Sequence, residues 1–311
     1  MDNMQVLTVA VSSRALFHIG DGDEIFQTQG REAFNAYMRE KEHVPLRPGP
    51  AFGLVKKLLA LNANDGSPRT RVEIILMSRN STDAGLRVME SVRHYGLPIE
   101  QAVFCAGGDR PAYALAMGAH LFLSTSPDDV KMAINAGLAA ATMMPSETPE
   151  DQCDPTIRIA FDGDSVLFSS EADEVFRAEG LDRFRESEVL NAKIPLGAGP
   201  FKGFLEALCL LQKGFSGDTC PVKLALVTAR GMPAHARVIH TLRAWGVVVD
   251  VAIFAGGKPK GPLLRAFGAD VFFDDTHKNV DSGRSHAITS CHVPFGTGHG
   301  IVLESPAATV A

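Results

Sequence analysis

Carboxylates occur in pairs at two places in the second half of the chain, each after an apolar run. Asp162 and Asp164 follow the first run, and Asp274 and Asp275 follow the second. Two carboxylates about 4 Å apart repel each other by roughly 4 kcal/mol at an effective dielectric constant near 20, so a cluster of them requires protons or a cation. Oxygen ligands without histidine or cysteine favour a hard cation, and Mg²⁺ is the usual one in phosphate chemistry.

A hydroxyl and a lysine lie between the two acidic pairs in the sequence. Thr228 ends an apolar run, and Lys260 follows the glycine pair 256–257. They would supply a hydrogen-bond donor and a positive charge to phosphate oxygens, and phosphoryl transfer needs little beyond positioning and charge neutralisation. Lys258 is an alternative phosphate ligand, although the register of the internal repeat described below favours Lys260.

Strand and helix patterns alternate around these residues. This alternation predicts an α/β fold with a parallel sheet covered on both faces, in which ligands gather beyond the carboxyl ends of the strands. The acids, the threonine and the lysine stand at those ends. In the second half, the expected strands are residues 157–161, 222–228, 247–254 and 269–273, and the expected helices are 201–213, 235–245 and 263–267.

The chain repeats itself at a spacing of 150 positions, without a gap from about residue 10 to residue 130. Gly49 falls on Gly199, and Gly96 falls on Gly246. Matched glycines carry weight because they mark turns that need particular backbone angles. We therefore expect two duplicated Rossmann-like domains, residues 1–150 and 151–311.

The residues at the strand ends resemble known motifs. Asp162-Gly-Asp164, Thr228, Lys260 and Asp274-Asp275 resemble, in order, the four motifs of the haloacid-dehalogenase-like (HAD-like) phosphatase superfamily. Longer strings resemble the cytosolic type I 5′-nucleotidase family over nearly the whole chain. These strings are residues 10–17, 76–81, 161–168, 199–208, 227–230 and 259–262.

The resemblance implies a Mg²⁺-dependent enzyme that hydrolyses nucleoside 5′-monophosphates, often AMP. Asp162 would attack phosphorus and form an aspartyl-phosphate, and Asp164 would be the general acid and base. Val166 departs from the superfamily pattern, in which many members have a threonine. The implied phosphate ligands are Thr228, Ala229 and Lys260, and the implied metal ligands are Asp162, Asp164 through its backbone carbonyl, Asp274 and Asp275.

The first half lacks this chemistry. In the 150-residue register, Asp162 falls on Ser12, and Lys260 falls on Arg110; no carboxylate stands at any aligned site position. We therefore expect residues 1–150 to be a degenerate, non-catalytic HAD-like domain whose pocket binds an anion, as part of the substrate or as a nucleotide effector. Candidate ligands are Arg14, Arg79 and Asn80, although both arginines could instead be surface charges or form structural ion pairs.

About fifty residues separate Asp164 from the next predicted strand, and they include the charged stretch 171–199. In the superfamily that the sequence resembles, an insertion at this point covers the active site. We expect a small helical cap here.

Composition bears on the binding partners, the cysteine chemistry and the cellular location. The 311 residues carry a formal net charge of −6, which disfavours general binding to nucleic acid. The five cysteines show no pattern typical of a disulfide framework or a zinc site. No signal peptide or membrane span is expected, so a cytoplasmic location is favoured. A homo-oligomer is left open.

Two alternatives remain on sequence grounds. The chain could be a phosphatase or phosphotransferase for another small phosphate ester, or a non-catalytic, two-lobed nucleotide-binding protein. The second alternative gives no reason for six site residues to occur together in one half. Taken singly, the acidic pairs could be turns or helix caps.

Overall fold

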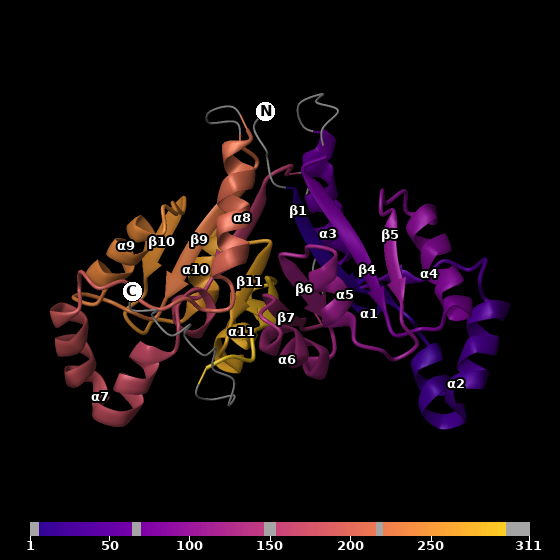
Figure 1. The fold of residues 1–311 in the computed structure, drawn as a ribbon, viewed down its shortest axis with the longest axis horizontal. Coiled ribbons are helices and arrows are strands. Elements are labelled where there is room, and N and C mark those ends of the chain that lie inside the picture. Colours follow the sequence, from indigo (N-terminus) through magenta and orange to yellow (C-terminus); the bar gives the residue numbers. More distant parts are fainter. Residues whose placement is uncertain (1–5, 64–69, 146–153, 216–219, 297–311) are drawn as a thin grey trace, which may run out of the picture. The chain divides into compact units, whose positions relative to one another are not determined.

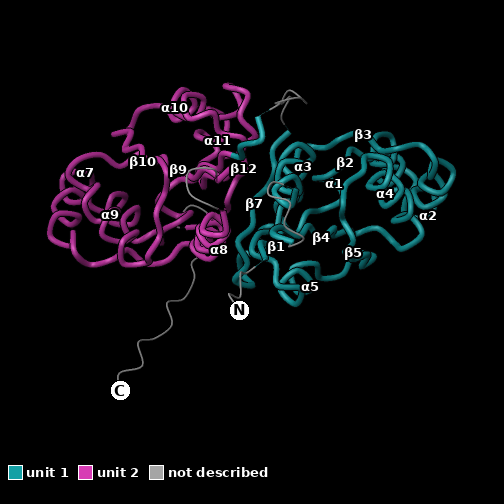
Figure 2. Tube along the Cα trace, turned by 90° about the horizontal axis from the view of Figure 1, so that it is seen from above, with its two compact units in different colours: residues 1–157 teal, residues 158–311 magenta. Residues whose placement is uncertain are grey.

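The computed structural model describes residues 6–63, 70–145, 154–215 and 220–296. The chain divides into two units, Met1–Ile157 and Arg158–Ala311 (Figure 2). Each unit has an α/β architecture built on a parallel sheet.

Unit 1 contains a five-stranded sheet in the order β7-β6-β1-β4-β5, in which the paired strands are parallel. These strands are β1 (Leu7–Ser12), β4 (Val72–Ser78), β5 (Gln101–Phe104), β6 (Leu121–Ser124) and β7 (Ala140–Met143). A short antiparallel pair joins β2 (Phe17–His18) to β3 (Arg47–Pro48). The helices are α1 (Ser13–Leu16), α2 (Gly22–Glu40), α3 (Phe52–Ala60), the 3₁₀ turn Leu61–Ala63, α4 (Thr82–His94), α5 (Arg110–Ala116) and α6 (Pro127–Asn135).

Unit 2 contains five strands in the order β10-β9-β8-β11-β12. They are β8 (Ile157–Phe161), β9 (Val222–Thr228), β10 (Val251–Phe254), β11 (Val271–Asp274) and β12 (Thr289–His292). A turn, Gly163–Leu167, follows β8. The helices are α7 (Glu171–Leu190), α8 (Lys202–Lys213), α9 (His235–Ala244), α10 (Lys260–Phe267) and α11 (His277–Arg284).

An aromatic cluster fixes α8 against the strands that carry the acids. Phe161 stacks on Phe273 at 5.6 Å between ring centroids, and Phe201 lies 4.9 Å from Phe273. All three side chains are buried, as is Phe204 on the same face of α8. Burial of such rings contributes much of the core energy, so β8 and β11 are held side by side. Their carboxyl ends are therefore fixed relative to each other.

Several element boundaries differ from the sequence prediction. β10 begins at Val251 instead of 247, and α10 begins at Lys260 instead of 263. The sequence pattern does not predict the strand β12, Thr-Ser-Cys-His, because most of its residues are polar. All four residues are nevertheless buried beside β11. None of the helices in the described part of the chain is long and apolar enough to cross a membrane.

The stretch expected to form a cap is largely helical. α7 is broken at Gly180, whose φ is +83°, so that it forms the two-segment hairpin visible in Figure 1. Glycine suits this position because an L side chain rarely adopts such a φ. The second segment carries the buried Glu188, which contacts residues near the site.

Candidate active site

Asp162 stands one residue beyond β8 and is nearly buried, with 7% of its surface exposed. Its backbone N–H donates to the carbonyl of Phe273 at 2.8 Å, which extends the ladder with β11. One carboxylate oxygen, Oδ1, accepts from the backbone N–H of Gly163 at 2.6 Å. The chain then turns through Ser165, whose φ is +61°.

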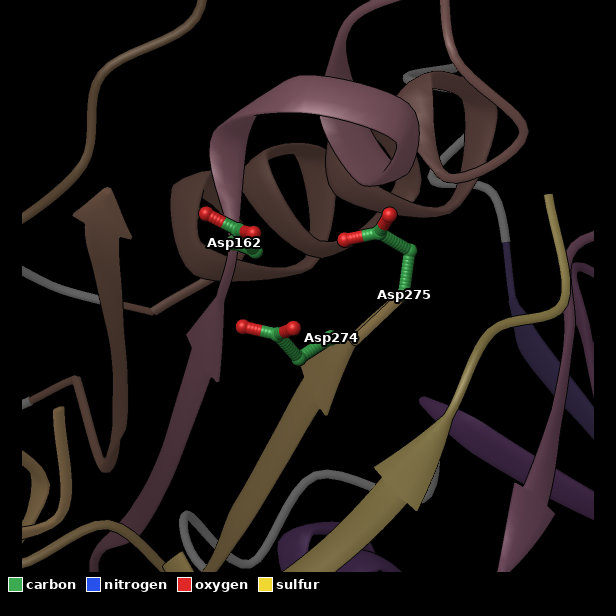
Figure 3. Close-up of side chains that lie close together, drawn as sticks. All are labelled: Asp162, Asp274 and Asp275. Atoms are coloured by element: carbon green, nitrogen blue, oxygen red, sulfur yellow. The ribbon is translucent and has the colours of Figure 1, made fainter. Parts of the chain in front are cut away.

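Asp274 ends β11, and Asp275 follows it. Carboxylate oxygens of Asp162, Asp274 and Asp275 lie within 4.8 Å of one another. Figure 3 shows the three side chains gathered at the ends of β8 and β11. Asp274 is fully buried, and its Oδ1 accepts from the backbone N–H of Thr276 at 2.8 Å and from Asn279 Nδ2 at 3.2 Å. Three carboxylates are thus held together by two adjacent strands.

Lys260 lies among these acids at the start of α10. Its Nζ is 2.6 Å from Asp162 Oδ1 and 2.7 Å from Asp274 Oδ2, and only 1% of the residue is exposed. Burial alone would lower the pKa of Lys260, but Asp162 and Asp274 raise it above its usual range. Lys258, the competing candidate, is exposed. The geometry therefore places Lys260, and not Lys258, beside the acidic cluster.

The acidic cluster holds more negative charge than one lysine offsets. Burial raises the pKa of Asp162, against the opposing effect of Lys260, and Asp274 and Asp275 raise it further. Burial, with repulsion from Asp274, raises the pKa of Asp275 to about 7. A hard cation would relieve this repulsion, and carboxylate oxygens are the donors that Mg²⁺ prefers. The side chains present therefore fit a Mg²⁺ site.

The side chain of Asp164 does not join the three clustered carboxylates. Its two oxygens accept from Arg230, at 2.8 Å from Nε and 2.7 Å from Nη2. Arg230 also pairs with the buried Glu188, which in turn accepts from Arg237 at 2.9 Å. Burial would lower the pKa of Arg230, but Asp164 and then Glu188 raise it. This buried network joins the second acid to α7 and α9.

The sequence did not predict the network of Asp164, Arg230, Glu188 and Arg237 beside the site. Arg230 belongs to the string Val-Thr-Ala-Arg, but nothing in the string indicates its partners. Asp173, on α7, was also missed; its carboxylate accepts from Ser165 Oγ at 3.3 Å. Burial and then repulsion from Asp164 raise the pKa of Asp173 to about 6. The signal that could have found these residues is buried charge, which a sequence does not display.

The predicted phosphate ligands on β9 lie at the same end of the sheet. Thr228 is buried, and its Oγ1 accepts from the backbone N–H of Arg230 at 3.1 Å. A Cβ placed on Gly163 would lie 3.3 Å from this oxygen. Ala229 follows Thr228, and its carbonyl accepts from Gly257 N–H at 3.1 Å. Thr228 therefore lies next to the turn that begins after Asp162.

In unit 1, the candidate ligands Arg14, Arg79 and Asn80 line the same two cavities. Arg14 pairs with Asp23 at 2.8 Å, and Arg79 pairs with Asp129, so both arginines form the ion pairs considered as an alternative. Both remain about half exposed. In the 150-residue register, unit 1 has no carboxylate at the positions that align with the site residues of unit 2. The structure nevertheless brings the carboxylate of Asp129, on α6, into the smaller of these cavities.

Comparisons with known proteins identify a family for this chain. The sequence profile described as 5′-nucleotidase matches residues 1–300. Human cytosolic 5′-nucleotidase 1B is 41% identical over an alignment of 287 residues, and the alignment covers 89% of this chain and 47% of the human protein. The chain thus spans about half the length of that relative. A solved structure, the histidinol dehydrogenase of Elizabethkingia anophelis, matches over 92% of this chain and 52% of that one, at 10% identity and a TM-score of 0.22, a likeness too weak to inform the fold or the function. With its profile matched almost from end to end, the chain belongs to the 5′-nucleotidase family.

Proposed function

We propose that this chain hydrolyses nucleoside 5′-monophosphates, of which AMP is the first to test, to a nucleoside and phosphate. Family membership supports this activity. The observation that carries it is the position of the Asp162 carboxylate, which lies beside two further carboxylates and the buried ammonium of Lys260. Such a group provides a nucleophile together with charges that can hold a phosphate.

In the proposed reaction, Asp162 attacks the phosphorus atom, and the bond from phosphorus to the 5′-oxygen breaks. The leaving oxygen takes a proton from Asp164, which later takes a proton from the water that hydrolyses the aspartyl-phosphate. Asp164 must release one of its bonds with Arg230 to carry that proton, because both of its oxygens accept from the guanidinium. Thr228 and Lys260 hold the phosphate oxygens, with the backbone N–H of Ala229.

The proposal includes Mg²⁺ as cofactor. The carboxylates of Asp162, Asp274 and Asp275 and the backbone carbonyl of Asp164 would hold it. When bound, it supplies positive charge that offsets the substrate phosphate beside these acids. The charge of Lys260 favours the ionised, nucleophilic form of Asp162, because it opposes the rise in pKa that burial causes.

We further propose that the two units are duplicated HAD-like domains and that only unit 2 is catalytic, with α7 as its cap. The strand orders support this: β7-β6-β1-β4-β5 corresponds, element by element, to β12-β11-β8-β9-β10. Gly49 and Gly199, which align in the repeat, also have the same structural role, because both lie against the backbone of a neighbouring segment. A Cβ would lie 2.6 Å from a backbone carbonyl oxygen at Gly49 and 2.4 Å from one at Gly199. Unit 1 has Ser12 in place of the nucleophile.

The human relative is named as cytosolic, and we propose a cytoplasmic location for this protein too. No role in binding nucleic acid is proposed, because the net charge of −6 disfavours it.

Phosphate release from a panel of nucleotides, with and without Mg²⁺, tests the proposal. We expect release from AMP, IMP, GMP or UMP that requires Mg²⁺ and is abolished in Asp162→Asn. If all nucleoside monophosphates fail and a sugar phosphate reacts, the substrate class is wrong. Activity that survives in Asp162→Asn would exclude the aspartyl-phosphate route.

A further inference from the structure

Two adjoining cavities in unit 1 are lined by polar side chains that the proposed reaction does not use. The smaller, about 250 Å³, is lined by residues at the ends of β1, β4 and β6, and the larger, about 510 Å³, is lined mainly by residues of α2. Arg14, Arg79 and Asn80 line both cavities. A ligand could therefore occupy the two spaces as one site.

The cavities are positively charged although the chain as a whole is acidic. Asp23 and Asp129 are the acidic residues that line them. Arg110 is affected by the neighbouring positive charges. Burial lowers the pKa of Arg110, and repulsion from Arg79 lowers it further, to about 10. An anionic ligand would relieve this repulsion. The four arginines that outweigh the two acids are Arg14, Arg31, Arg79 and Arg110.

Two buried hydrogen-bond donors in this lining have no acceptor within the described part of the chain. They are Nδ2 of Asn80 and Nε of Arg110. Only 9% of Asn80 and 3% of Arg110 are exposed. Buried donors are nearly always satisfied, and a pair of exceptions that line one cavity indicates a missing acceptor. Arginine forks suit the oxygens of a phosphate in particular.

The larger cavity adds an aromatic wall. Phe26 is 42% exposed, and its ring lies 5.7 Å from that of Phe34 in an edge-to-face arrangement. The side chains of Gln27 and Asn35 line the same space. Aromatic rings stack well on nucleobases, and amides can pair with base edges. The volume lies within the usual range for small-molecule sites, roughly 300–1,000 Å³.

We propose that unit 1 binds a nucleoside phosphate, with the phosphate in the smaller cavity among Arg79, Asn80 and Arg110 and the base against Phe26. The ligand is held without being consumed, because no carboxylate nucleophile stands at the end of β1. This site is separate from the proposed hydrolysis in unit 2.

The test uses the full chain carrying Asp162→Asn, in EDTA so that turnover is blocked, with AMP, inorganic phosphate and adenosine as probes. Hydrogen–deuterium exchange reads each unit separately. We expect AMP to protect backbone amides in residues 12–35 and 78–82. Inorganic phosphate should protect residues 12–14 and 78–82 but not residues 22–35, and adenosine should protect none of these segments.

Matched variants in the same background identify the ligating side chains. Asn80→Ala and Arg79→Ala should weaken AMP binding to unit 1 by about tenfold or more, measured from the AMP concentration that gives half-maximal exchange protection in residues 12–35 and 78–82. Asn80→Ala is the cleaner variant, because its Nδ2 has no partner to lose. Arg39→Ala is the control, since Arg39 pairs with Asp83 at 3.1 Å and does not line either cavity. It should bind AMP like the parent.

The absence of AMP-dependent protection in unit 1, or equal affinities in Asn80→Ala and Arg39→Ala, would overturn the proposal. Equal protection by inorganic phosphate and AMP would overturn the nucleoside assignment. Failure of the hydrolysis assay would leave these readouts intact, because they report on unit 1 alone.

Discussion

Replacing Lys260 by methionine should damage both the stability and the activity of unit 2, whereas the same change at Lys258 should affect neither. Lys260 is almost completely buried between Asp162 and Asp274, and Lys258 is exposed. Methionine keeps the length and most of the apolar stem, so the substitution removes mainly the charge. The pair of variants therefore separates the two lysines that the sequence left open.

The magnitude follows from the two ion pairs, at 2.6 and 2.7 Å. Removing one partner of a buried ion pair costs about 3–5 kcal/mol, because the remaining charges stay buried and unpaired. For a domain of this size, such a loss lowers Tm by roughly 6–20 °C. Loss of a positive charge that holds the transferred phosphate should lower kcat by on the order of 10²–10³.

Thermal melts in EDTA and in Mg²⁺ provide a second measurement. Without Lys260 the acidic cluster is more negative, so Mg²⁺ should raise the Tm of Lys260→Met by more than it raises that of the parent. A cation at 100 times its Kd stabilises by about 2.7 kcal/mol. Lys260 lowers the pKa of Asp162 in the parent, so this pKa should be higher in Lys260→Met. As the pH is lowered, any remaining activity of the variant should therefore decline at a higher pH than the activity of the parent.

Three results would refute this reasoning: parental kcat in Lys260→Met, an equal loss in Lys258→Met, or a smaller Mg²⁺-dependent rise in Tm in Lys260→Met than in the parent.

Three further predictions concern the surroundings of the site. Arg230→Met should lower the free energy of unfolding in urea by about 3–5 kcal/mol, because it leaves the buried Glu188 and the partly buried Asp164 with one cation fewer. Arg183→Met breaks only exposed ion pairs and should change the free energy of unfolding little, so equal losses in the two variants would contradict this prediction. The pKa of Asp275 rises to about 7 from 3.8, so the folded state binds more protons than the unfolded state and loses stability as pH rises through this range. In EDTA, Asp275→Asn should therefore melt above the parent at pH 8 and close to it near pH 4, and a gap that widens on acidification would exclude this cause. Gly199→Ala should lower Tm, because the new Cβ would lie 2.4 Å from two backbone carbonyl oxygens and this overlap should cost about 1–3 kcal/mol of stability. In the control Gly203→Ala, the new Cβ would have no atom within 4 Å, so this variant should be as stable as the parent or slightly more stable.

The fold was largely predictable because its strands are apolar runs and its turns are marked by glycine. β8 and β9 have the predicted bounds. β12 was not predictable, because its polar side chains are buried through contacts with residues far away in the sequence. Helix α11 is likewise polar, with buried residues only at Val280 and Gly283, so its own pattern is weak.

The sequence by itself predicted that the acidic pairs and a lysine gather at one edge, because strand ends of a parallel sheet meet there and spacing locates the strand ends, but it left Lys258 open beside Lys260. It did not determine how the charges pair. Only the tertiary structure decided that Lys260 lies between Asp162 and Asp274, that Asp164 pairs with Arg230, and that Asp129 enters the basic pocket of unit 1. The physical reason is that a side chain's partner depends on burial and on neighbours brought together by folding, whereas the order of residues specifies only which elements can form.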